Sequence, residues 1–120
     1  MVVVDVGGND YNNCFPTPDD AFVQAYVEML KLLRQKYPHA ILLNICGGSI
    51  PSDQRRNKAA TRVERSVQHF ADERAVFVEV PVGVVSDEDA PGHFGHHSVV
   101  GHKKISDFLE PVIRKQMGWF

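Results

Sequence analysis

Short apolar runs alternate with amphipathic segments along the whole chain, and this alternation restricts the possible folds more than any other feature. Three of the runs are rich in Val, Ile and Leu, and a stretch with helical periodicity follows each of them. Strands that are apolar throughout and separated by helices indicate a parallel sheet, whose two faces are both covered. The sequence therefore predicts an α/β fold of three layers, with about three strands and three helices.

Turn and cap signals set the expected bounds of these elements. Strands are predicted at 2–6, 40–46 and 75–80, and helices at 21–37, 55–72 and 98–117. Pro38 ends the first helix, and Ser98 is expected to cap the last one. No linker separates these segments, so residues 1–120 are predicted to form a single domain.

Composition excludes several classes of function. The formal net charge is -2, so the chain lacks the basic surplus typical of proteins that bind nucleic acid or anionic membranes. The longest apolar runs are far shorter than a membrane span, and we expect no signal peptide within these residues, because the apolar strand follows Met1 directly. The compartment therefore stays open. Two cysteines, Cys14 and Cys46, are too few for a disulfide scaffold, although they are able to pair in an oxidising compartment.

The first polar cluster follows the first strand directly, as Gly7-Gly8-Asn9-Asp10. In a parallel sheet, chemistry collects at the carboxyl ends of the strands, and this cluster lies at such an end. The glycines allow a sharp turn, after which the Asn9 amide is available to polarise a carbonyl oxygen. The alternative is an ordinary turn closed by hydrogen bonds of Asn9 and Asp10.

The second cluster is rich in histidine and leads into the last helix. Four of the six histidines lie between His93 and His102. An imidazole at a helix start is suited to act as a general base for a hydroxyl nucleophile. The alternatives are a polar surface loop, or a metal site built from His93, His96 or His97, and His102, for which the chain offers no matching set of Cys and His elsewhere.

Together the two clusters resemble the motifs of a known enzyme group. Gly7-Gly8-Asn9-Asp10 is similar to the Gly-x-Asn-Asp block of the SGNH (GDSL-type) esterase superfamily. His96-His97-Ser98-Val99-Val100-Gly101-His102 is similar to its last block, His-Pro-Ser-x-x-Gly-His, with His97 where proline is usual. The overall pattern most resembles the family 2 carbohydrate esterases, which remove acetyl groups from polysaccharides. The expected fold is accordingly a partial flavodoxin-like SGNH hydrolase domain.

This resemblance implies roles for particular residues. Asn9 would donate its side-chain amide to the oxyanion, and His96 would exchange the proton of a catalytic serine. Asp10 would hold the loop or touch substrate, while Gly7 and Gly8 would allow the turn. No cofactor or metal is expected, and the substrate would be a small-molecule or carbohydrate ester.

The chain also departs from the superfamily pattern. The Gly-Asp-Ser block with the nucleophile is missing, because the chain begins at what corresponds to the third strand. Ser49 is a weak internal substitute, since it follows Gly47-Gly48 but lacks a Gly-x-Ser-x-Gly context. The positions of the usual aspartate hold His93 and Phe94, so a Ser-His dyad fits better than a triad. We therefore expect an amino-terminally truncated esterase domain that is inactive or nearly so by itself.

Truncation predicts an exposed apolar edge along the first strand, from Val2 to Val6, where further strands would otherwise pair. This edge suggests a rival function: a non-catalytic α/β interaction module that binds a partner, or a second copy, through the strand edge or the histidine-rich loop.

Overall fold

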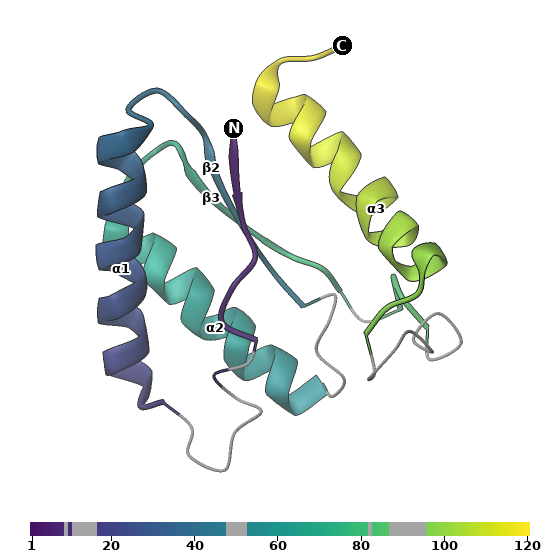
Figure 1. The fold of residues 1–120 in the computed structure, drawn as a ribbon, viewed down its shortest axis with the longest axis horizontal. Coiled ribbons are helices and arrows are strands. Elements are labelled where there is room, and N and C mark those ends of the chain that lie inside the picture. Colours follow the sequence, from purple (N-terminus) through teal and green to yellow (C-terminus); the bar gives the residue numbers. More distant parts are fainter. Residues whose placement is uncertain (9, 11–16, 48–52, 82, 87–95) are drawn as a thin grey trace. The chain divides into compact units, whose positions relative to one another are not determined.

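The computed structural model describes residues 1–8, 10, 17–47, 53–81, 83–86 and 96–120, with only the backbone described at 53–57. These residues fall into two compact units, Met1–Glu79 and Val80–Phe120. The first contains β1 (Val2–Val4), α1 (Asp19–Lys36), β2 (Leu42–Cys46), α2 (Asp53–Phe70) and β3 (Ala75–Glu79), and the second contains α3 (Val99–Met117) (Figure 1). The predicted α/β fold with three strands and three helices is confirmed.

The three strands form one parallel sheet in the order β1-β2-β3. In the pairing of β1 with β2, Val4 lies opposite Asn44, and in the pairing of β2 with β3, Cys46 lies opposite Glu79. All three strands therefore end at the same edge of the sheet, as the sequence predicts. The central strand β2 is buried throughout, which explains its continuous apolar sequence.

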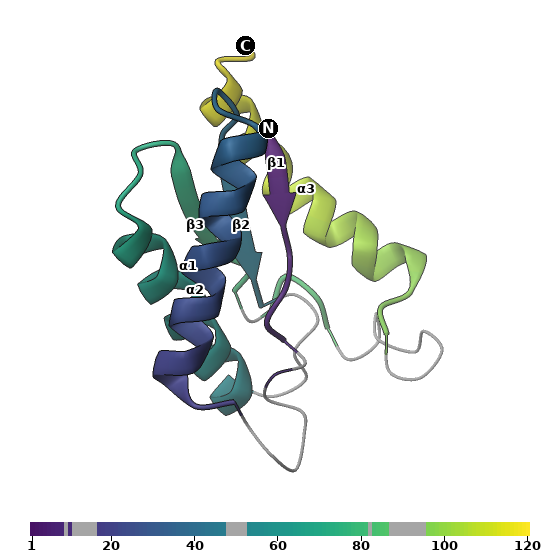
Figure 2. The same ribbon diagram turned by 60° about the vertical axis from the view of Figure 1, so that its left-hand side comes forward.

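Helices α1 and α2 cover one face of this sheet, as the two views in Figures 1 and 2 show. The core on this side joins alternate residues of the strands, Val4, Leu42 and Cys46, to the predicted apolar stripes of both helices. The main helical members of this core are Phe22, Val23, Tyr26, Leu30, Ala59, Ala60, Val63 and Val67. The amphipathic periods of the sequence thus located the buried faces of both helices.

Several element ends differ from the predicted bounds. β1 stops at Val4 rather than residue 6, since its pairing with β2 ends there. β2 begins at Leu42 rather than residue 40, because the Ala40 amide instead donates to the carbonyl of Tyr37 over 3.1 Å. α2 begins at Asp53 and ends at Phe70, and Ala71 then has a positive φ of 52°, which helical backbone does not allow.

The second unit contains α3 with both caps in place. The Ser98 hydroxyl accepts a hydrogen bond from the Gly101 amide, which confirms the predicted amino-terminal cap. Gly118 ends the helix in the left-handed conformation, with φ 66°. Among the residues that the structure describes, no helix is long and apolar enough to cross a membrane.

Candidate active site

The turn after β1 depends on a glycine for two physical reasons. Gly7 has a φ of 107°, a conformation that other residues adopt at a cost. A Cβ atom at this position would also lie 2.8 Å from Cζ of Phe22, which is closer than real side chains approach. Glycine is therefore required at position 7, where the sequence predicts a sharp turn, because the Phe22 ring of α1 packs directly against its backbone.

The segment after this turn carries the predicted oxyanion donor. Gly8 and Asp10 are half-buried, whereas Asn9 lies outside the described residues. The Thr17 hydroxyl donates to Oδ1 of Asp10 over 3.5 Å, a long contact that joins the two sides of the segment 10–17. The roles of Asn9 and Asp10 that the resemblance implies stay predictions.

A buried polar pair, Tyr26 of α1 and Asn44 of β2, lies two residues before the end of the central strand. The Tyr26 hydroxyl donates to Oδ1 of Asn44 over 3.0 Å, and the Asn44 amide donates to the carbonyls of Leu42 and Val76. Loss of hydration raises the pKa of the Tyr26 hydroxyl, and the nearby Cys46 and Asp5 raise it further. The tyrosine therefore stays neutral and acts as a structural donor.

The ends of β1 and β2 surround this pair with ionisable groups. Loss of part of its hydration raises the pKa of the Asp5 carboxyl, although the residue as a whole stays exposed. Cys46 ends β2 with a buried side chain, and Gly47 follows with a φ of 124°. Ser49 and Cys14 lie outside the described residues.

The predicted general base belongs to the second unit. His96 is exposed and lies two residues before Ser98, the cap of α3. The half-buried ring of His97 lies edge-on to the ring of His102, with 5.9 Å between the ring centroids. His96 thus lies just before the helix start that the sequence predicts, and His93 and Phe94 lie outside the described residues.

The alternative metal site was predicted from the same histidines. Within the described ranges, no three His, Cys, Asp or Glu side chains come close enough together to hold a metal ion. His93, one of the proposed ligands, lies outside those ranges.

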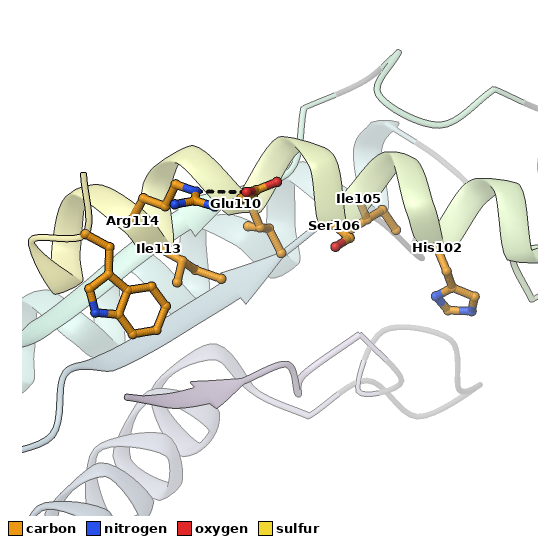
Figure 3. A pocket seen from close by; sticks show the side chains of 8 residues that line it. His102, Ile105, Ser106, Glu110, Ile113 and Arg114 are labelled. Atoms are coloured by element: carbon orange, nitrogen blue, oxygen red, sulfur yellow. Dashed lines mark hydrogen bonds and ion pairs between the residues drawn. The ribbon is translucent and has the colours of Figure 1, made fainter.

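A hollow of about 450 Å³ runs along one side of α3 (Figure 3). Its apolar lining comes from Ile105, Leu109, Ile113 and Trp119. Polar groups of His102, Ser106, Glu110 and Arg114 complete it, and the last two form an ion pair over 2.8 Å. The predicted apolar stripe of the last helix therefore lines a hollow within the second unit.

Sequence reasoning missed the polar residues that lie inside the core. Asn44 is fully buried in β2, and Arg62 is 6% exposed in α2. A signal for each was present: Asn44 interrupts an otherwise apolar strand, and Arg62 lies at helical spacing from Ala59 and Ser66 on the buried side. A single polar residue at a core position indicates a specific buried partner.

The fold and the strand ends can be compared with those of known proteins. The first unit has a parallel sheet with glycine turns after β1 and β2, at Gly7 and Gly47, and the second unit has a histidine before the cap of α3. No protein-family model matches this chain, and no curated protein matches it at the level of sequence.

Two solved structures of a family two carbohydrate esterase from Clostridium thermocellum do match. The enzyme in complex with cellohexaose has a TM-score of 0.87 to this chain, and an active-site mutant has a TM-score of 0.85. Each is 25% identical over 99% of this chain. The chain spans 36% of the length of either solved chain. The resemblance to a portion of a family 2 carbohydrate esterase is therefore confirmed in the fold.

Proposed function

We propose that this chain is the histidine- and asparagine-bearing part of a carbohydrate esterase that removes acetyl groups by serine-histidine catalysis. The observation that carries the proposal is the match of 99% of the chain to the fold of a carbohydrate esterase, and the two motif blocks of the sequence support it. The nucleophile would come from a Gly-Asp-Ser block outside these 120 residues.

The chemistry assigns one step to each residue. The serine oxygen attacks the acetyl carbonyl carbon while His96 takes the serine proton, and the bond to the sugar oxygen then breaks as His96 returns that proton to the leaving alcohol. Water releases the acetyl group from the serine in the second half of the reaction. The Asn9 amide donates to the negative oxygen of the tetrahedral intermediate, a contact worth about 3 kcal/mol in comparable enzymes.

The substrate class follows from the structural relatives. The family two carbohydrate esterase is seen with cellohexaose, a chain of sugar units, so we propose an acetylated polysaccharide as the substrate of the complete enzyme.

The first experiment is to sequence the transcript upstream of Met1. An in-frame strand followed by Gly-Asp-Ser supports the proposal, and the longer protein should then hydrolyse 4-nitrophenyl acetate. In that protein, His96→Ala should abolish turnover, and Asn9→Ala should lower kcat about 100-fold or more because the oxyanion loses a donor. Full activity of both variants would refute the assigned roles.

The 120-residue chain provides the control. Without the Gly-Asp-Ser block it should show no serine-dependent turnover. Turnover by this chain alone that Ser49→Ala abolishes would mean that the nucleophile lies inside it, contrary to the proposal.

A second candidate function, partner binding without catalysis, is favoured by the edge of the sheet. β1 pairs only with β2 in the described sheet, and Val3 is 51% exposed on it. A stop codon upstream of Met1, together with a stable dimer in light scattering, would favour this function. Because a charge protects an edge strand from pairing, Val3→Lys should then shift the dimer toward monomer, whereas Leu32→Lys on an exposed part of α1 should not.

A further inference from the structure

Helix α3 carries an apolar face that the described residues of its unit leave largely uncovered. The helix has 19 residues, yet only Gly101 and Leu109 are buried in it. Helix α1 has 18 residues and buries four side chains in the core, Phe22, Val23, Tyr26 and Leu30. An apolar stripe on a helix of a folded protein normally packs against another element, so the apolar face of α3 requires a partner.

The uncovered side of α3 borders the hollow of about 450 Å³. Ile105, Leu109 and Ile113 line it and recur at every fourth position, which places them along one side of the helix. Trp119 lines the same hollow from beyond the helix end and is 56% exposed. Its amide donates to the carbonyl of Arg114 over 2.9 Å, which fixes the backbone there. We call these four apolar residues the α3 face.

The lining of this hollow favours a packed chain segment over a small ligand. Ligand pockets typically contain a few polar groups that converge on the ligand. All the described residues that line this hollow come from α3 or from the chain just after it, 102–119. The two charged side chains among them, Glu110 and Arg114, form an ion pair with each other over 2.8 Å (Figure 3). An apolar stripe along a single helix is instead typical of a surface that packs against another element.

The matched solved structures are much longer than this chain. The match takes in 99% of this chain, α3 included, but only 36% of either solved chain. Most of each solved chain therefore has no counterpart among these 120 residues. The first unit has an uncovered apolar position as well, since Val3 is 51% exposed on β1, which pairs only with β2 in the described sheet. Each unit thus presents apolar surface of the kind that additional chain would bury.

We propose that the α3 face is the surface on which the segment with the Gly-Asp-Ser block packs in the longer esterase. The inference rests on the proposed function, because that segment carries the nucleophile there. Its apolar side chains fill the hollow and bury Ile113 and Trp119. His96 lies two residues before Ser98, the cap of α3, so the same helix joins the general base to the segment that bears the nucleophile.

Trp119 is the only tryptophan of the 120 residues, so its fluorescence reports directly on the α3 face. In the 120-residue chain at low concentration, iodide should quench its emission strongly, because more than half of the residue is exposed. In the longer esterase, Trp119→Phe identifies the share of the emission that belongs to this residue. That share should shift to shorter wavelength and lose most of its quenching by iodide, since the packed segment excludes the ion.

A pair of substitutions on α3 tests the same packing through stability. Ile113→Thr keeps the branched shape of the side chain but adds a hydroxyl, which is costly where the α3 face is buried. Val100→Thr is the matched control, because Val100 is 57% exposed in the first turn of α3 and lies outside the lining of the hollow. In the longer esterase, Ile113→Thr should lower the urea midpoint far more than Val100→Thr, whereas in the 120-residue chain both effects should be small. If the longer Ile113→Thr variant does not fold, Ile113→Val should lower the midpoint in the same direction.

Strong quenching of Trp119 in the longer esterase would overturn the proposal, and so would shielding of Trp119 in the dilute 120-residue chain. Shielding that appears only where light scattering shows a dimer would assign the α3 face to a second copy instead. A stop codon directly upstream of Met1 would overturn both this inference and the proposed function.

The inference and the proposed function are also able to fail separately. If Trp119 is shielded in a longer protein whose His96→Ala variant keeps full activity, the proposed function fails and the packing stands. If an active longer esterase leaves Trp119 open to iodide, the packing fails and the proposed function stands.

Discussion

At the scale of single residues, the Tyr26–Asn44 pair shows how a polar group is accommodated in the core. Asn44 is 0% exposed in the central strand, and its oxygen and its amide both have partners. A buried amide without those partners would destabilise the sheet, so the tyrosine hydroxyl is as necessary as its ring. The apolar stripe of α1 predicts the buried ring of Tyr26 but not the partner of its hydroxyl.

We expect Tyr26→Phe to lower the free energy of unfolding by about 1–2 kcal/mol, because it leaves Oδ1 of Asn44 without its donor. Tyr37→Phe is the matched control, since Tyr37 is 52% exposed after the end of α1, and its effect should stay within about 0.5 kcal/mol. Urea-induced unfolding measures both. Equal effects of the two substitutions would contradict the role given to the buried hydrogen bond.

At the scale of elements, Arg34 joins the end of α1 to the turn between α2 and β3. Its Nη1 donates to the carbonyls of Tyr37, Pro38 and Ala40, the closest at 2.6 Å. Its Nε and Nη2 bind both carboxylate oxygens of Asp72, over 2.7 and 3.1 Å. The Arg34 side chain thus provides hydrogen-bond donors for the backbone carbonyls that follow α1. It also holds the turn between α2 and β3 through Asp72.

The Asp72 carboxylate gives stability a dependence on pH. Hydrogen bonding to Arg34 lowers the pKa of this carboxyl in the folded chain below its ordinary value. The stabilisation is therefore fully present above about pH 4, the value of an unfolded Asp, and is lost as the pH falls through the lower pKa of the folded chain.

Asp72→Asn should thus lower the free energy of unfolding by about 1 kcal/mol at pH 7, because both side chains of the ion pair retain some exposure to solvent. Its deficit relative to the unaltered chain should shrink as the pH falls below about 4. Urea titrations across this pH range measure the difference. Asp107→Asn, in the exposed pair with Lys103, should change stability by no more than about 0.5 kcal/mol. A deficit for Asp72→Asn that does not vary with pH would contradict the assignment.

At the scale of the whole molecule, the two units differ in how much core each one holds. Residues Met1–Glu79 contain the sheet, two helices and the main cluster of buried side chains. Residues Val80–Phe120 contain a single described helix, in which only Gly101 and Leu109 are buried. A lone helix of this length is marginal in water, because helices depend on tertiary packing.

The prediction that residues 1–120 form one domain can therefore be tested with fragments. A peptide of residues 80–120 should show little helix in far-ultraviolet circular dichroism, and an added fragment of residues 1–79 should increase the signal beyond the sum of the two spectra. Full helicity of the peptide alone would instead mean that the second unit folds by itself.

The sequence by itself determined the order of elements, the parallel sheet and the buried helix faces. These follow from periodicity and from glycine, proline and cap signals, which act over a few residues and are therefore visible in a linear chain. The exact ends of the strands were not predictable, because β1 stops where its pairing with β2 stops.

Only the tertiary structure decided which polar groups meet. Tyr26 finds Asn44 across 18 positions, and Arg62 reaches Asp19 across 43. The obligatory Gly7 likewise depends on the Phe22 ring, which no local pattern places beside it. Hydrogen bonds and close packing of this kind arise when helices dock on a sheet, so their partners are set by distances in space rather than by spacing along the chain.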